Sequence, residues 1–436
     1  MIKNLNPNRK QIFSNTGWLF LEKLFRLFTA FFVTAIVAQY LGPSNFGILS
    51  YTISVLAIFE PIANLGINSV IKKYLIYNPN NEDQKNILST ILILRFISSI
   101  FVISILNFLT HKFDFLSSDN SAIASIITIL SISLFFRIFD IFELWFESRL
   151  ESKYPTNVKI LSFFIISIIR LLFVYWQLDV QYFAIAFTLE SIICASTYLI
   201  LLKKKNISLI TFNINLKLIK KLVNESWPLF FATMSVMIYM KIDQIMLKHM
   251  INDTAVGIYS AAVKISEPWS FLAVSLVASI FPTILSAKTR SLRDYYTKIQ
   301  KLYAVMTLTA IVLGISTAFL APFIINIIFG DQFLDSSAVL QIHIWGNLSI
   351  FWAVAQDPWD IAENKTKYIL VKTLSAAILN VILNLWWIPL FGVIGAACAT
   401  VVSYFWNSTI MNLFNKKTRK IFFLQISSIK FWKYIR

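Results

Sequence analysis

Hydrophobic residues fill the chain in long runs that are separated by short polar stretches. A helix needs about 20 apolar residues to cross the hydrocarbon core of a bilayer, and about twelve of the runs have this length. The pattern therefore predicts an all-α polytopic membrane protein with about twelve transmembrane helices. The predicted segments are 17–38, 46–70, 87–109, 121–142, 158–176, 182–202, 228–250, 255–281, 303–328, 338–356, 368–388 and 392–413.

Lys and Arg residues are distributed unevenly between the loops that join these segments. Of the 39 basic residues, thirty fall on the two termini and one alternate set of loops, and only Lys112 and Lys248 fall on the other set. Positive charges concentrate on the cytoplasmic side of membrane proteins. The asymmetry predicts a multi-pass protein of the bacterial inner membrane with both termini in the cytoplasm. The seven remaining basic residues lie within or at the rims of the segments: Lys23, Arg26, Arg95, Arg137, Arg170, Lys241 and Lys264.

The composition excludes several classes of protein. With 57% hydrophobic and 14% charged residues, the 436-residue chain is too apolar for a soluble protein. The net charge of +17 does not indicate nucleic-acid binding, because the basic residues lie mainly in short loops beside the membrane, where anionic lipids attract them. Cys194 and Cys398 lie in apolar segments, and no Gly-rich phosphate loop or metal-ligand spacing is present. We therefore expect no enzymatic centre, no cofactor and no metal site.

A basic stretch divides the chain into two halves of six predicted helices. Gly47-Ile48 and Gly257-Ile258 occupy corresponding places in the halves, each where a turn becomes a helix. Six helices in each half predict two parallel bundles, related by a pseudo-two-fold axis along the membrane normal, around a central cavity. The predicted parts are an N-terminal six-helix bundle at 1–205, a basic cytoplasmic linker at 206–227, a C-terminal six-helix bundle at 228–415 and a basic cytoplasmic tail at 416–436.

Several short blocks resemble one family of transporters. The most specific are residues 241–247 (KIDQIML) and 256–262 (VGIYSAA), and further blocks follow in the same order at 40–47, 64–68, 279–282 and 327–333. Together they are similar to the O-antigen and capsular polysaccharide flippases of the multidrug/oligosaccharidyl-lipid/polysaccharide exporter superfamily. The resemblance implies helices in two bundles around a central cavity. It also implies transfer of undecaprenyl-pyrophosphate-linked oligosaccharide from the cytoplasmic to the periplasmic leaflet, for surface polysaccharides such as the O-antigen of lipopolysaccharide.

The resemblance further implies the partners of such a transporter. These are the lipid-linked oligosaccharide, membrane lipids, and the polymerase and chain-length regulator of the same polysaccharide. Coupling to a proton or sodium gradient is plausible for the superfamily, with Asp243 or Glu267 as the first candidates. The sequence does not identify the sugars, the coupling ion or the oligomeric state.

Charged residues within the apolar segments are the candidate functional residues, because an isolated ionised side chain at the bilayer centre is costly. Asp243 and Lys264 are expected at similar depth across a tight hairpin, and Lys241 and Glu267 can form a second rung. The pairs are either a structural ladder or a cavity lining in which lysines meet pyrophosphate and carboxylates exchange protons. Pro268 predicts a kink beside Glu267.

Two arginines of the first half are further candidates for the substrate cavity. Arg26 stands four residues after Glu22, so the two can neutralise each other. Arg95 has no acidic partner on its own segment, and either pairs with a residue such as Glu60 or contacts phosphate through its forked guanidinium. Structural pairs are the favoured interpretation for Arg170 with Glu190 and for the stripe from Arg137 through Asp140. His343 is expected to be a hydrogen-bonded structural residue.

Three other functions fit the same general pattern. An ion-coupled multidrug or cation antiporter of the same superfamily would favour unpaired carboxylates, whereas most carboxylates here have basic candidates nearby. A membrane-embedded polymerase or ligase would need large outward loops, and the longest one here lies near 110–120. A lipid-linked peptidoglycan-precursor flippase is a closer relative, but the blocks at 241–247 and 256–262 favour the polysaccharide branch.

Overall fold

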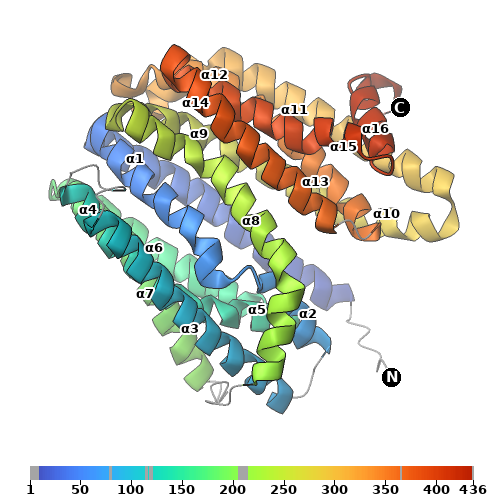
Figure 1. Ribbon diagram of the computed structural model, residues 1–436, viewed down its shortest axis with the longest axis horizontal. Helices are drawn as coiled ribbons and strands as arrows, with labels where there is room; N and C mark the ends of the chain where they lie inside the picture. Colours follow the sequence, from blue (N-terminus) through green and yellow to red (C-terminus); the bar gives the residue numbers. More distant parts are fainter. Residues whose placement is uncertain are drawn as a thin grey trace. The chain divides into compact units, whose positions relative to one another are not determined.

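A computed structural model describes residues 9–77, 81–112, 116, 121–204, 215–363 and 366–434, and over these residues the chain is helical without β-strands (Figure 1). The helices up to residue 204 are α1 (Arg9–Asn64), α2 (Asn68–Tyr77), α3 (Asn81–His111), α4 (Ser121–Phe136), η1 (Arg137–Asp140), α5 (Ile141–Ser148), α6 (Lys153–Tyr175) and α7 (Val180–Lys204). The helices after residue 214 are α8 (Leu216–Met250), α9 (Asp253–Ser266), η2 (Glu267–Trp269), α10 (Ser270–Arg290), α11 (Leu292–Phe329), η3 (Asp331–Phe333), α12 (Ser336–His343), α13 (Gly346–Ala362), α14 (Thr366–Phe405), the π-helix η4 (Trp406–Ile410), α15 (Met411–Phe414), α16 (Arg419–Ser428) and η5 (Phe431–Lys433).

The predicted membrane segments fall on these helices, although the apolar stretch predicted at 46–70 ends with α1 at Asn64. Among the described residues, ten helical stretches are long and apolar enough to cross a membrane. Two of them, Leu21–Asn64 and Tyr368–Phe414, have 44 and 47 residues, about twice the length that one crossing needs. Each contains a glycine with non-helical backbone, Gly42 at φ 68° and Gly392 at φ 59°. Glycine adopts this conformation without a steric penalty, so each stretch holds two of the predicted segments and the predicted all-α membrane fold is confirmed.

The helices form two compact units. Unit 1 comprises Met1–Tyr40 and Val55–Phe230, and unit 2 comprises Leu41–Ser54 and Phe231–Arg436. The short segment that follows the Gly42 kink therefore groups with the second half of the chain. The predicted linker at 206–227 lies outside the described residues as far as 214, and from Leu216 it forms the first turns of α8.

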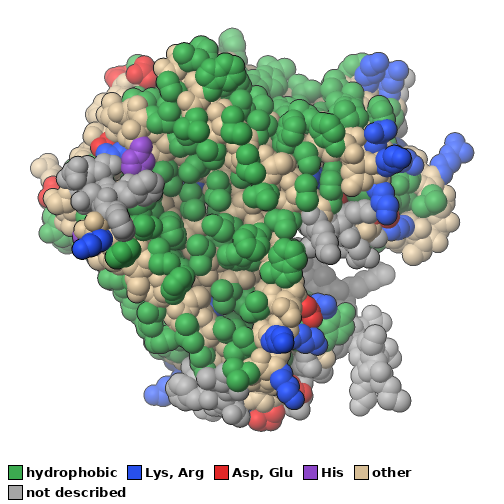
Figure 2. Space-filling view, in the orientation of Figure 1, with side chains coloured by type: hydrophobic (Ala, Val, Ile, Leu, Met, Phe, Trp, Pro, Cys, Tyr) green, Lys and Arg blue, Asp and Glu red, His purple; other side chains and the backbone are tan. Residues whose placement is uncertain are grey.

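Each unit has its own hydrophobic core. In unit 1, Phe142, Trp145 and Phe146 of α5 meet apolar side chains from α2, α3 and α7. In unit 2, α10, α11 and α13 pack together around residues such as Tyr303 and Trp352 (Figure 1). Large apolar side chains are also exposed along the long helices, and they cover much of the face shown in Figure 2. Burial of polar contacts inside and exposure of apolar residues outside is the arrangement that a lipid environment requires.

Two glycines allow the closest approach of helices in unit 2. A Cβ atom built on Gly47 would lie 1.8 Å from the carbonyl oxygen of Asp253, and one built on Gly257 would lie 1.9 Å from the carbonyl oxygen of Pro43. These are the glycines of the matching dipeptides Gly47-Ile48 and Gly257-Ile258 noted in the sequence. Small residues let membrane helices approach closely, so glycine is required at both positions because backbone atoms fill the space of a side chain.

The predicted basic tail at 416–436 contains a helix. Residues Arg419–Ser428 form α16, which packs against α11 and buries Ile421, Gln425 and Ser428. The tail is therefore part of unit 2, at least as far as the described residues extend.

Replacement of Gly47 by Ala should destabilise the protein strongly. The added methyl group overlaps a backbone carbonyl that no rotamer change can move, so we expect a cost of about 3 kcal/mol or more. Thermal unfolding of the purified protein in detergent measures this as a lower midpoint. Gly17→Ala is the matched control, because a Cβ there meets nothing within 4 Å. Equal midpoints for the two variants would contradict the close-contact interpretation.

Candidate functional site

Oppositely charged side chains meet inside the spans of unit 1. We call the following residues the unit 1 charged cluster: Glu22, Arg26, Glu60, Arg137, Asp140, Arg170 and Glu190. They come from α1, η1, α6 and α7, so four separate elements contribute to the cluster.

Glu190 of α7 links two arginines. Its carboxylate lies 3.2 Å from Nη2 of Arg170 on α6 and 3.5 Å from Nη2 of Arg26 on α1. Arg26 also lies 3.5 Å from Glu22, one helical turn earlier. The predicted pairs Glu22–Arg26 and Arg170–Glu190 are therefore confirmed, and the contact between Arg26 and Glu190 joins them into one group.

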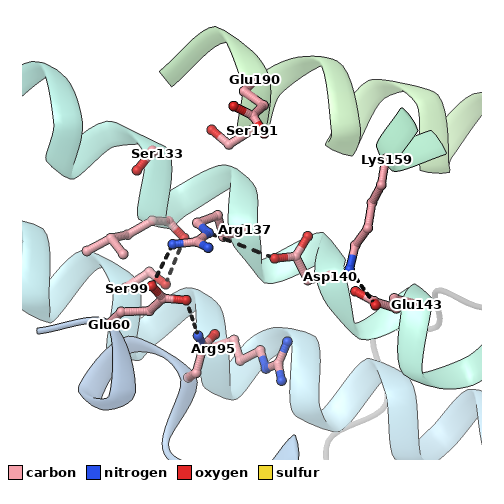
Figure 3. A network of polar contacts seen from close by, with 12 residues as sticks. Glu60, Arg95, Ser99, Ser133, Arg137, Asp140, Glu143, Lys159, Glu190 and Ser191 are labelled. Atoms are coloured by element: carbon pink, nitrogen blue, oxygen red, sulfur yellow. Dashed lines mark hydrogen bonds and ion pairs between the residues drawn. The ribbon is translucent and has the colours of Figure 1, made fainter. Parts of the chain in front are cut away.

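Arg137 holds the second group together. Helix α4 ends at Phe136, and the tighter 3-10 turn η1 carries Arg137 and Asp140 in the middle of the span. Figure 3 shows Arg137 between two carboxylates, with Nη1 at 2.6 Å from Glu60 and Nε at 4.0 Å from Asp140. The stripe predicted from Arg137 through Asp140 is present, and its strongest partner is Glu60, which the sequence did not predict.

Arg95 has a different partner from the one considered. Its guanidinium donates to the side chain of Asn68, while Glu60 binds Arg137 instead. The side chain of Arg95 is only 1% exposed, and its Nε has no hydrogen-bond partner among the described residues. The suggested pairing with Glu60 is wrong, because Arg137 reaches that carboxylate. A phosphate contact of Arg95 would need a conformation that exposes it, and stays a prediction.

Several members of the unit 1 charged cluster are accessible although they lie in membrane spans. The side chains of Arg26 and Asp140 are each 41% exposed, and those of Glu60 and Arg137 are each 31% exposed. Ionised groups this exposed need water or a polar ligand rather than hydrocarbon around them. These four side chains are therefore the most exposed charges of the cluster.

A predicted ion pair in unit 2 joins α8 to the turn after α9. Nζ of Lys241 lies 3.1 and 3.3 Å from the carboxylate oxygens of Glu267. The kink predicted beside Glu267 is also present, because α9 ends at Ser266 and residues Glu267–Trp269 form a 3-10 turn that contains the proline. Asn347 Nδ2 donates to the carbonyl oxygen of Ser266 at 2.9 Å, so a neighbouring helix satisfies a backbone group at the kink. The predicted second rung is confirmed.

Asp243 is buried among neutral polar groups. Its buried carboxylate accepts a hydrogen bond from Tyr259 Oη at 2.6 Å, another from Asn384 Nδ2 at 2.5 Å, and a third from Thr400. Asn384 and Thr400 lie on opposite sides of the Gly392 kink in α14. Lys264, the expected partner, is on the exposed surface of α9. The contacts of Asp243 are thus hydroxyl and amide donors where the sequence suggested a lysine.

One buried charged residue, Lys372, was missed by the sequence analysis. Lys372 counted there as a loop residue, yet it lies in α14, is 5% exposed, and donates to Gln356 Oε1 at 3.3 Å and to Asn412 Oδ1 at 3.5 Å. Its position near the start of a helix, six residues into α14, explains the error. Polar pairs at helical spacing, such as Asn380 with Asn384 and Gln356 with Asp360, were the sequence signal that these helices have buried polar faces. His343 is buried and bonds Ser266 Oγ at 2.8 Å, as expected for a structural histidine.

Comparison with known proteins identifies the family. Residues 12–288, more than half of the chain, match the family described as polysaccharide biosynthesis protein. The chain belongs to this family. It is also 29% identical over 184 residues to the protein named Probable flippase AglR of Haloferax volcanii, a match that covers 38% of this chain and only 36% of that protein.

Solved structures show the fold. The lipid II flippase MurJ in an inward closed conformation has a TM-score of 0.71 at 15% identity, covering 96% of this chain and 91% of MurJ. An inward-facing multidrug resistance MATE family transporter of the MOP superfamily has a TM-score of 0.70 at 13% identity, covering 94% of this chain and 96% of that transporter. A MOP superfamily transporter from Pyrococcus furiosus has a TM-score of 0.62 at 12% identity, covering 97% of this chain and 94% of that transporter. The chain is a multi-pass membrane protein with the fold of these transporters.

Replacement of Glu190 by Gln should destabilise the protein more than replacement of Lys73 by Gln. Glu190→Gln leaves Arg170, whose side chain is 17% exposed, without its carboxylate, and loss of one partner from a largely buried pair costs about 3 kcal/mol. Lys73 is 60% exposed and pairs with the partly exposed Glu225, so its loss should cost less than about 1 kcal/mol. Thermal unfolding in detergent gives the order of the two midpoints. An equal or larger drop for Lys73→Gln would show that the pairing of Glu190 with the arginines does not stabilise unit 1.

Proposed function

We propose that this protein is a flippase that moves undecaprenyl-pyrophosphate-linked oligosaccharide repeat units from the cytoplasmic to the periplasmic leaflet of the inner membrane. The repeat units would serve a surface polysaccharide such as O-antigen or capsule. The observation that supports this most is the set of accessible arginines within the spans of unit 1, in a chain of the polysaccharide biosynthesis protein family. The names of the similar flippases, AglR and MurJ, agree with this function.

The arginines provide the electrostatic part of the proposed transfer. Two unit charges 4 Å apart attract by about 4 kcal/mol at the effective dielectric constant near a protein surface. A pyrophosphate brought beside Arg26 or Arg137 would compete with Glu190 or Glu60 for these guanidinium groups, whose planar forks suit phosphate oxygens. Because carboxylates hold the arginines between transport events, the side chains would remain paired before and after an anion passes.

In the proposed transport no covalent bond of the substrate is formed or broken. Substrate would enter by its headgroup while the prenyl chain stays in lipid, and alternating access would expose the headgroup first to one side and then to the other. Lys241, Lys264 and Glu267, and Arg95 if it becomes exposed, are proposed as further residues that contact the headgroup during transport. The polysaccharide polymerase and the chain-length regulator would act on the product.

We further propose that Asp243 binds the coupling cation, either a proton or a sodium ion. Its carboxylate, Tyr259 Oη and Thr400 Oγ1 bring oxygen atoms together in a buried place, and Oδ1 of Asn384 has no hydrogen-bond partner among the described residues. Oxygen ligands of this kind suit hard cations, and a buried carboxylate can equally take a proton. The neutral surroundings favour this function, since the hydrogen bonds to the carboxylate come from a tyrosine, an asparagine and a threonine.

Proteoliposomes with the purified protein and a fluorescent pyrophosphate-linked oligosaccharide lipid test both proposals. The wild-type protein should move the label between leaflets, measured as altered access to an added quencher, and either a proton or a sodium gradient should accelerate the transfer. Asp243→Asn should reduce the gradient-driven rate at least about tenfold, because it removes the carboxylate that would bind the cation. It should still fold, because Asn384 can reverse its amide and offer the free Oδ1 to the new donor.

Asp335→Asn is the matched control, because Asp335 is exposed and belongs neither to the unit 1 charged cluster nor to the polar groups around Asp243. Full gradient-driven transfer by a folded Asp243→Asn variant would rule out the coupling site and leave the flippase proposal standing. Transport of organic cations with no movement of the lipid-linked label would support the antiporter instead.

A further inference from the structure

The C-terminal segment is strongly basic. Residues 416–436 contain seven Lys and Arg residues and no Asp or Glu. In the part that the structure describes, Lys416, Lys417, Lys430 and Lys433 are all exposed. Figure 2 shows basic side chains gathered around the C-terminal helix, beside the apolar surface of the long helices. The charge is therefore available to a partner.

Helix α16 presents an apolar side between these lysines. Ile421, Gln425 and Ser428 form its buried face. On its other side Phe423 is 60% exposed, and Trp432 in the following turn is 57% exposed. An exposed apolar face flanked by lysines is typical of helices that lie at the surface of a membrane, where the rings enter the lipid and the charges meet headgroups.

Buried polar contacts hold α16 in place. Gln425 Nε2 donates to the carbonyl oxygen of Ser408 at 3.0 Å, and Thr418 Oγ1 donates to that of Asn412 at 2.9 Å. Ser408 belongs to the π-helix η4, which has a wider hydrogen-bond pattern than an α-helix. The α16 side chains thus bind backbone groups at the end of the last span, and the outer side of α16 is held facing outward.

We propose that α16 and η5 form a docking surface for the headgroups of anionic phospholipids. Charge complementarity identifies the occupant, because the segment has seven basic and no acidic residues and its exposed apolar side chains suit the acyl region beneath such headgroups. Each lysine beside an anionic surface strengthens attraction by about fivefold. Lipid docking at this surface does not depend on which substrate the protein transports.

Docked lipid would act on the end of the last span. Asn412 accepts a hydrogen bond from the buried Lys372 and donates to Gln356 Oε1 at 2.8 Å. The contacts from α16 through Asn412 therefore reach α13 and α14. A lipid that orders α16 should reduce local opening of η4 and α15 as well.

Hydrogen exchange of the full-length protein in lipid nanodiscs tests the proposal. Discs of phosphatidylcholine are compared with discs that contain phosphatidylglycerol. Amides of 416–434 should exchange at least about fivefold more slowly with the anionic lipid, and the difference should shrink at high salt because the attraction is screened. The variant with Gln at Lys416, Lys417, Lys430 and Lys433 should lose the difference, and α11 serves as an internal reference for intact folding.

The matched control carries Gln at four exposed lysines of unit 1: Lys203, Lys204, Lys217 and Lys220. It should keep the full difference at 416–434, and Arg at the four tail positions should keep it too. Equal exchange of the wild-type segment in both kinds of disc would overturn the proposal. So would an equal loss in the control variant, which would show a general charge effect, or slower exchange produced only by added protein or nucleic acid.

Discussion

Ionised side chains inside apolar helices are tolerable only where a partner of opposite charge or a hydrogen-bonding group meets them, and this requirement shapes both units. In unit 1, Glu190 serves two arginines from different helices, and Arg137 lies between Glu60 and Asp140. These contacts fix where α1, α6 and α7 can lie relative to one another. In unit 2, Lys241 with Glu267 ties α8 to the kink that follows α9.

The need for such partners is met in two different ways in this protein. The unit 1 charged cluster is partly exposed and holds four carboxylates and three arginines, so each arginine has at least one carboxylate beside it. Asp243 is buried and surrounded by hydroxyl and amide groups, so its surroundings are neutral and polar. The proposed transport uses the exposed arginines of unit 1 for the anionic headgroup and the buried carboxylate of unit 2 for the coupling cation.

Sequence predicted the spans well because crossing a bilayer imposes a length and a composition on each helix separately. It also predicted contacts between residues close in the chain, such as Glu22 with Arg26 on one helix and Lys241 with Glu267 across a hairpin. The pairs that it missed join distant residues. Glu60 and Arg137 are 77 positions apart, and Asp243 and Thr400 are 157 apart. Such contacts depend on how helices pack, which hydrophobic periodicity does not specify.

The proposed transfer of a lipid-linked oligosaccharide across the membrane is measured most directly by following that lipid in the native host. A clean deletion is made, surface polysaccharide is scored, and the leaflet that holds the repeat units is determined. We expect loss of the surface polymer, with repeat units trapped on the cytoplasmic face and released by a plasmid copy of the gene. Repeat units that reach the periplasmic face in the deletion strain would contradict it.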